Sequence, residues 1–319
     1  MARSDSLRAF IHGTALLLMS QVANATFSIA ACDASGACGV AVATNNLAVG
    51  ATVPYARAGV GAVATQFETN PDYGPRGLGL LAKGETASRC VDALLAGDGN
   101  FEGQGVAFRQ ISVVGMDGSS AIFTGEAAQA AAWAGGRRGP GYAIIGNGLA
   151  GERVVADMEG AFLRTNGALA QRLMAALTAG QRAGGQSTGG LSAALLVRTR
   201  AGGFQDVDLR IDASPTAVDA LGRLLDLRLA HEAMLRAERF AGGAKTADAA
   251  REVTDALRLA PNWDRIWLRA ARVERGLRNS VRACEYLRKF AVLNPAWGAI
   301  ERDREFHTLC GSGGSQRPD

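Results

Sequence analysis

Histidine is almost missing from this chain of 319 residues, which has only three: His12, His231 and His307. None of them lies in residues 26–228. That region therefore has no imidazole for a Ser-His-Asp or Cys-His nucleophile, and none for a histidine-based metal site. Lysine is equally scarce, and Lys83 is the only lysine base that the same region offers.

Several other signatures are missing too. The chain has no Gly-rich phosphate loop, no dinucleotide-binding glycine motif and no zinc-like cysteine spacing. After residue 25 no apolar run approaches the roughly 18–20 residues that span a bilayer. The arginines late in the chain alternate with acids, as in 264–278, which is typical of a solvated surface. We therefore expect no cofactor, no metal, no nucleic-acid partner and no membrane partner in the mature chain.

The first 25 residues resemble a cleaved export signal. Arg3 and Arg8 supply positive charge, residues 9–19 are mostly apolar, and Ala23-Asn24-Ala25 is a small-x-small cleavage site. The sequence therefore predicts a periplasmic or secreted protein whose mature form begins at Thr26.

Thr26 would then carry a free α-amine beside its own hydroxyl, which is a nucleophile and a general base in one residue. The alternative is that cleavage exposes whichever residue comes next, without chemical consequence. Residues 26–228 contain no histidine to act as a base. An N-terminal threonine supplies its own base, so it can act as a nucleophile there.

The five cysteines fit an oxidising compartment. Cys32 and Cys38 flank a turn between two strand-like runs, so we predict a disulfide across that hairpin. Cys284–Cys310 is a weaker prediction of the same kind. Cys90 is left over and is expected to be a buried apolar thiol.

Residues 26–228 alternate strand-like and helix-like runs, which predicts an α+β domain in layers. The glycine pairs Gly135-Gly136 and Gly184-Gly185 are interpreted as loops, and Asp117-Gly118 as a hairpin turn. The predicted strands are 26–32, 39–44, 60–67, 107–116, 120–125, 141–147, 191–199 and 204–212, and the predicted helices are 78–83, 86–95, 152–163, 168–179 and 216–229.

Residues 229–310 are richer in alanine, arginine and leucine. Pro261 and Pro295 each precede a tryptophan by two residues, and their spacing is the period of tetratricopeptide helix hairpins. This predicts an all-α tetratricopeptide-like domain with a short closing helix, followed by a disordered tail at 311–319. A generic helical bundle is the alternative. Small residues at the close-approach positions support the repeat: Ala237, Ala249, Ala256, Ala271 and Ala283, with Phe290 fitting less well.

Several stretches of residues 26–228 form a recognisable set, among them TFSIAACD (26–33), NPDYGPRGL (70–78), RQISVV (109–114) and GNGLAG (146–151). With them, residues 26–228 resemble the domain-of-unknown-function 1028 family, which is placed in the N-terminal-nucleophile (Ntn) hydrolase superfamily. The resemblance implies a four-layer αββα sandwich with the nucleophile at the start of the first strand. The sequence departs from the family pattern at GGQSTGGL (184–191), where Gln186 replaces an acid.

The resemblance and the predicted strand positions suggest roles for individual residues. Besides Thr26, the catalytic candidates are Asn45 to orient its amine, Arg57 to supply positive charge, and Asn147 as an oxyanion donor. Asn147 and Gln66 lie at predicted strand ends, where their amides would serve either as oxyanion donors or as loop caps. The substrate-binding candidates are Gln66, Asn70, Tyr73, Arg109 and Gln186.

Two hypotheses follow. In the first, the protein is an exported amidohydrolase that cleaves a small amide or peptide through an acyl-enzyme on Thr26. In the second, it is a non-catalytic exported scaffold whose helical repeats dock a protein partner. Association into a homo-oligomer is expected only by analogy with Ntn domains.

Overall fold

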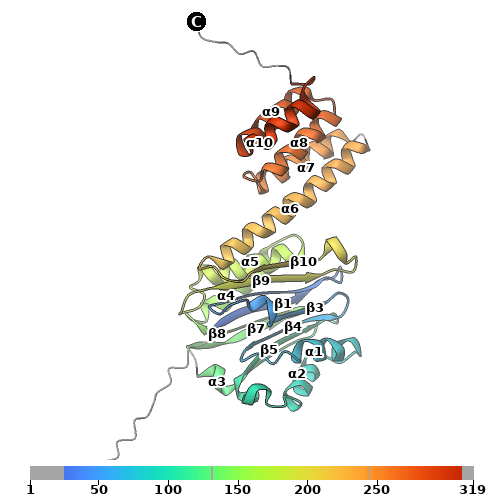
Figure 1. Ribbon diagram of the computed structural model, residues 1–319. Coiled ribbons are helices and arrows are strands. Elements are labelled where there is room, and N and C mark those ends of the chain that lie inside the picture. Colours follow the sequence, from blue (N-terminus) through green and yellow to red (C-terminus); the bar gives the residue numbers. More distant parts are fainter. Residues whose placement is uncertain (1–24, 131, 244, 311–319) are drawn as a thin grey trace, which may run out of the picture.

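A computed structural model describes residues 25–130, 132–243 and 245–310 (Figure 1). The predicted export signal, apart from Ala25, and the predicted tail at 311–319 lie outside the described residues. Within those residues the chain forms an α+β region followed by a region made only of helices, as the sequence predicted.

The first sheet, sheet A, has six strands in the order β10-β9-β2-β1-β8-β7, and every neighbouring pair is antiparallel. Strand β2 follows β1 through a tight hairpin. Because β1 pairs with β2 on one side and with β8 on the other, it lies in the interior of the sheet. The strands are β1 (Thr26–Cys32), β2 (Cys38–Thr44), β7 (Trp133–Gly139), β8 (Tyr142–Leu149), β9 (Ser192–Arg198) and β10 (Val207–Ile211).

The second sheet, sheet B, has four antiparallel strands in the order β3-β4-β5-β6. They are β3 (Pro54–Arg57), β4 (Gly61–Phe67), β5 (Arg109–Gly115) and β6 (Ser120–Thr124). Sheet B packs on sheet A through contacts of β4 and β5 with β1 and β8. Small and β-branched side chains such as Ala30, Val42 and Ala64 fill the space between the sheets.

Helices cover the outer face of each sheet (Figure 1). On sheet A, Phe27 and Ile29 of β1 pack beneath the amphipathic helices α4 and α5. On sheet B, Val63 and Ile111 pack beneath α1 and α2. The helices of this region are α1 (Tyr73–Ala82), α2 (Ala87–Ala96), α3 (Glu126–Gln129), α4 (Arg153–Arg164) and α5 (Leu169–Arg182).

Two local predictions were wrong. Gly135-Gly136 is not a loop but lies within β7, because its glycines permit a close approach to β8. A Cβ on Gly136 would lie only 2.3 Å from the carbonyl oxygen of Ile144. The helix predicted at 78–83 begins earlier, at Tyr73, because Pro75 falls in its first turn, where no N–H is needed.

The helical region begins inside one long helix, α6 (Ala217–Gly242), which was predicted to end near residue 229. Leu221 and Leu225 of α6 belong to the core above sheet A, whereas Ala230 and Met234 belong to the core of the helical region. No glycine or proline interrupts the helix between these two parts. The other helices are α7 (Thr246–Leu259), α8 (Asp264–Gly276), α9 (Ser280–Leu293) and α10 (Pro295–Glu301), followed by a short π-helical segment (Arg302–Phe306).

Helices α6 and α7 form one hairpin and α8 and α9 another (Figure 1). The small residues expected at the close approaches are fully buried: Ala237, Ala249, Ala256, Ala271 and Ala283. Among the residues that the structure describes, no helix combines the length and apolar character required to cross a membrane.

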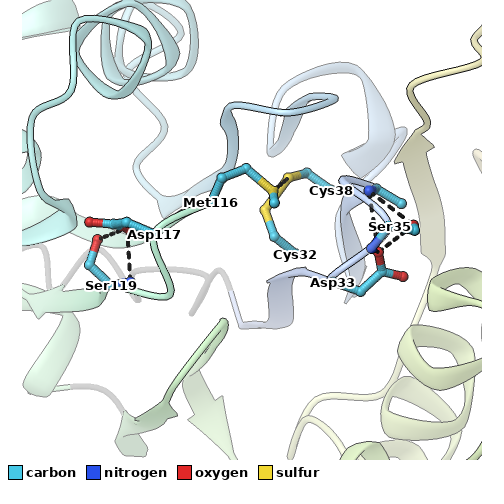
Figure 2. The surroundings of a disulfide bond; sticks show 8 residues. Cys32, Asp33, Ser35, Cys38, Met116, Asp117 and Ser119 are labelled. Carbon is cyan, nitrogen blue, oxygen red and sulfur yellow. Dashed lines mark hydrogen bonds between the residues drawn. A yellow bond between two sulfur atoms is a disulfide. The ribbon is translucent and has the colours of Figure 1, made fainter.

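Both predicted disulfides are present, between Cys32 and Cys38 and between Cys284 and Cys310. Figure 2 shows the first one at the β1–β2 hairpin, where the sulfur of Met116 lies 3.4 Å from that of Cys38. Cys90 is the buried free thiol that was expected, and burial raises its pKa to about 11. Two disulfides are typical of proteins outside the cytoplasm.

Replacing Cys284 and Cys310 together with serine should lower the free energy of unfolding by about 3 kcal/mol, since this disulfide closes the longer loop. The matched double substitution at Cys32 and Cys38 removes a much shorter loop and should cost about 2 kcal/mol. Denaturant unfolding of both variants measures the difference. A larger loss for the Cys32 and Cys38 pair would contradict the loop-length argument.

Candidate active site

Thr26 is the first residue of β1 and is 95% buried, with only 5% of its surface exposed. Because β1 lies between β2 and β8, Thr26 is directly opposite Thr44 on one side and Asn147 on the other. Its hydroxyl donates a hydrogen bond of 3.2 Å to the hydroxyl of Thr44. The end of sheet A thus places a buried threonine hydroxyl among polar side chains from three strands.

The peptide bond before Thr26 belongs to the same site. Ala25 is fully buried, and its carbonyl oxygen accepts hydrogen bonds from the Thr44 hydroxyl at 2.7 Å and from Nε2 of Gln186. Gln186 follows α5 and is held near β8 by a bridge to Leu149. In the full chain the Thr26 nitrogen is an amide, so it becomes a base only if residues 1–25 are removed.

A network of three side-chain amides lies beneath Thr26, in the space between the sheets. Nε2 of Gln66 donates to the Thr26 carbonyl at 3.2 Å and to Oε1 of Gln110 at 2.8 Å. Nδ2 of Asn147 donates to the same oxygen of Gln110 at 2.8 Å. The Ser28 hydroxyl donates to Oε1 of Gln66 at 2.6 Å. These bonds fix the orientation of each amide.

Two buried acceptors in this site remain without a hydrogen-bond partner among the described residues: Oδ1 of Asn147 and Oε1 of Gln186. Buried polar atoms of this kind are rare in folded proteins and are frequent where a ligand or water binds. A cavity of about 60 Å³, lined in part by Thr44, Gln186 and Ser192, lies beside the site. It has room for water next to Thr44 and Gln186.

Replacing Gln110 with leucine should lower the free energy of unfolding by about 2–4 kcal/mol. The substitution removes the acceptor of Asn147 and the donor to the Thr124 hydroxyl and the Gly146 carbonyl, all of them buried or partly buried. Thermal unfolding measures the loss. Gln129 is an exposed amide with one bond to a backbone carbonyl, so its replacement by leucine is the matched control. Equal losses for the two variants would contradict the network's role.

Of the predicted catalytic residues, Asn45 and Arg57 make their hydrogen bonds to residues other than Thr26. Nδ2 of Asn45 donates to the Thr188 hydroxyl at 2.6 Å, in an exposed position just after β2. Arg57 is exposed and pairs with Gly61, at the opposite end of β4 from Gln66. Its guanidinium contacts the Leu78 carbonyl at 3.4 Å. Gln66 contacts Thr26, Asn147 lies opposite it on β8, and Gln186 contacts the preceding Ala25.

The other three substrate-binding candidates converge elsewhere, on the buried carboxylate of Asp98. Arg109 donates to it at 2.9 Å, the Tyr73 hydroxyl at 2.5 Å, and the Asn70 amide at 3.4 Å. Arg109 also donates to three backbone carbonyls of the surrounding loops: Glu68, Phe101 and Gln104. This cluster lies on the outer face of sheet B, where it ties the loop after α2 to the sheet.

The charges in this cluster shift the pKa values of its members. Burial opposes ionisation of Asp98, but the hydrogen bonds from Arg109, Tyr73 and Asn70 outweigh it and hold the pKa of Asp98 below its ordinary value. Burial and the Asp98 hydrogen bond raise the pKa of the Tyr73 hydroxyl. The donor nitrogens of Arg109, the Asn70 amide nitrogen and the Tyr73 hydroxyl all have partners inside the protein, so the arrangement suits a structural role.

Sequence reasoning missed Thr44, Gln110 and Asp98. Thr44 follows from the predicted Cys32–Cys38 hairpin, whose register pairs Thr26 with Thr44. A signal for Gln110 existed in RQISVV, where polar residues alternate with apolar ones along a buried strand. Asp98 gave none. Among the described residues, no group of three or more His, Cys, Asp and Glu side chains is arranged to hold a metal ion.

Comparisons with known proteins agree on the α+β region. Residues 26–221 match the model of a protein family described as a family of unknown function, DUF1028. The fold is similar to the crystal structure of protein SPO2555 from Silicibacter pomeroyi, whose title names the same family. The TM-score is 0.56 and the identity 32%, over 63% of this chain and 88% of that chain. No curated protein matches the chain.

Proposed function

The chain belongs to the DUF1028 family of unknown function, and we propose that it is an exported Ntn-type amidohydrolase with Thr26 as its nucleophile. The observation that carries this proposal is the surroundings of Thr26. Its hydroxyl is buried at the start of an interior strand, beside the one peptide bond whose loss gives it an amine. Two packed antiparallel sheets with helices outside them support the Ntn-type arrangement.

The chemistry begins with the free amine of the mature chain. An α-amine has a pKa of about 8, so about a tenth of it is neutral at pH 7 and can accept the hydroxyl proton. The hydroxyl oxygen then bonds to the substrate's amide carbon. When the carbon–nitrogen bond breaks, the leaving amine takes that proton. Water hydrolyses the resulting ester, which releases the acid and restores the threonine.

The negative oxygen formed during attack needs fixed donors. The candidates are the second N–H of the Asn147 amide and the Thr44 hydroxyl, because both residues lie directly opposite Thr26 on the neighbouring strands. The amide network beneath them holds Asn147 in one orientation. Gln66 supports the Thr26 backbone through its carbonyl. The proposed substrate is a small amide or peptide.

Export and folding must occur in a fixed order for this proposal. Ala25 is buried and its carbonyl is hydrogen-bonded in the folded chain, so a peptidase cannot reach the Ala25–Thr26 bond there. We propose that residues 1–25 are removed from the extended chain during export to the periplasm or beyond, before the domain folds.

The test starts from protein recovered after export, whose mass should correspond to a chain beginning at Thr26. A threonine-directed β-lactone should then add one label, which peptide mapping places on Thr26. Replacing the exposed Thr52 with alanine is the control and should leave labelling unchanged. Protein that retains residues 1–25 should not react. A mature chain that begins elsewhere, or one that begins at Thr26 without taking the label, would rule out the proposal.

A second candidate function, docking of a protein partner by the helical region, is favoured by exposed apolar side chains on its last helices. These are Val281 and Val292 on α9 and Ile300 on α10. We propose that α6–α9 form two tetratricopeptide-like hairpins, supported by the proline spacing and by the buried alanines between the helices. If Thr26 takes no label in any form, this docking function is the one that remains.

A further inference from the structure

We infer that the space filled by Ala25 in the full chain becomes the acyl subsite of the mature enzyme, and that this subsite takes only small aliphatic acyl groups. The inference rests on the proposed function, because it needs Thr26 as the nucleophile. Here the carbonyl of Ala25 stands for the carbonyl of a bound acyl group, and its Cα stands for the next carbon. The methyl and the nitrogen of Ala25 stand for the two substituents on that carbon.

The Ala25 carbonyl is a fair stand-in because it is already an acyl group on the same threonine. In the full chain it is attached to the nitrogen of Thr26, and in an acyl-enzyme it would be attached to Oγ1 of that residue. These two atoms belong to one residue, and an acyl group can pass from one to the other through a five-membered cyclic intermediate. The acyl group therefore stays within reach of the same neighbours in either position.

Those neighbours are built to hold a carbonyl. The Thr44 hydroxyl and Nε2 of Gln186 both donate to the Ala25 oxygen, and the two side chains are 1% and 6% exposed. When Ala25 leaves, both donors lose their acceptor in a place that is largely closed to solvent. Buried donors without a partner are costly, so an incoming carbonyl oxygen is favoured at this point.

The wall opposite the Ala25 methyl sets the size of the group. That wall is the backbone of Gly148, which has a φ of +60°, and a Cβ built on Gly148 would lie 2.6 Å from the Cβ of Ala25. The Gly148 carbonyl is fixed by hydrogen bonds from the backbone N–H and the hydroxyl of Ser187, at 3.1 and 3.0 Å. The Cα of Ala25 already carries two heavy atoms, N and Cβ, so an acyl carbon with two methyl groups fits this space. A substituent that extends beyond the position of Cβ, or an aromatic ring, would meet anchored backbone.

The inference is tested with p-nitrophenyl esters of acetate, isobutyrate, 2-ethylbutyrate and benzoate, on exported protein whose mass shows that it begins at Thr26. Intact mass identifies the acyl adduct, and release of nitrophenol gives the rate of acylation. Each rate is divided by the rate at which hydroxide cleaves the same ester, which corrects for differences in intrinsic reactivity. Acetyl and isobutyryl should transfer to Thr26 at least about tenfold faster than 2-ethylbutyryl, which extends both branches by one carbon, or benzoyl. A factor of about ten is in the range that one misplaced carbon gives in a fitted pocket.

Gly148→Ala should narrow the subsite further. The isobutyryl rate should fall by about tenfold or more, because one of its two methyl groups must take the place of the Ala25 Cβ, 2.6 Å from the added Cβ. The acetyl rate should fall less, because acetyl has no atom at that position. Gly189→Ala is the matched control, since Gly189 also has a positive φ but faces open space. Gln186→Leu should slow all four esters by a similar factor, because it removes a carbonyl donor and leaves the wall unchanged.

The outcomes separate the two proposals. If Thr26 is acylated at rates that do not depend on acyl size, or if Gly148→Ala leaves the isobutyryl rate unchanged, the inference is wrong and the nucleophile stands. If a chain that begins at Thr26 forms no adduct with any ester, both proposals fall.

Discussion

Replacing Thr26 with alanine should lower the turnover of the best small ester or amide by about 10⁴-fold or more, since removing a covalent nucleophile costs at least this much in other hydrolases. The substitution keeps the α-amine and a small residue after Ala25, so export processing should be unaffected. It removes a single 3.2 Å hydrogen bond to Thr44, and the fold should survive. Steady-state kinetics on exported protein of confirmed mass measures the effect.

Thr26→Ser is the matched control, because serine keeps the hydroxyl and the amine and loses only the methyl. It should retain turnover within about tens of fold of the natural chain. Turnover of the natural chain and of Thr26→Ser should rise with pH and level off above about pH 9, where about nine-tenths of the α-amine is neutral. Turnover above about 1% in Thr26→Ala would show that the hydroxyl is not the nucleophile.

The fold was predictable from the sequence where local pattern and long-range packing agree. The β1–β2 hairpin is an example, since alternating apolar residues, a turn and two cysteines all indicate it. The strand β7 was missed because its sequence, WAGGRRG, has the glycine content of a loop. Only its pairing with β8 makes it a strand, and that partner lies outside any local window.

The site was less predictable because it depends on which face of a strand each residue occupies. Arg109 and Gln110 are consecutive on β5, so their side chains point to opposite faces of sheet B. Gln110 reaches the amide network under Thr26, while Arg109 joins Asp98 on the helix-covered side. A family resemblance singles out the stretch that contains both, but it cannot say which neighbour faces the threonine.

Replacing Arg109 with methionine should lower the free energy of unfolding by about 3–5 kcal/mol, the second large effect we expect. Arg109 and Asp98 form an ion pair whose side chains are 1% and 6% exposed. Removal of the cation therefore leaves a buried carboxylate without its countercharge. Denaturant unfolding measures the loss. Arg153→Ala is the control, since it breaks an exposed pair with Asp157 and should cost about 0.5 kcal/mol or less.

The same pair makes the domain acid-labile. The pKa of Asp98 is below its ordinary value in the folded chain, so its contribution to stability is complete above the unfolded value of about 3.9 and is lost as the pH falls through the folded value. In Arg109→Met the carboxyl has lost its main partner, so the steep fall in stability below about pH 4 should flatten. A parallel fall in both proteins would contradict this assignment.

Arg109→Met also decides between a structural and a substrate-binding role for that residue. All its contacts lead to Asp98 and to loop carbonyls, and it lies across sheet B from the amide network. At a temperature where the variant remains folded, turnover and KM for a small acetyl or propionyl ester should therefore stay within about threefold of the natural chain. A selective rise in KM in folded protein would instead mean that substrate reaches the Asp98 cluster, and that its buried cation contributes to recognition.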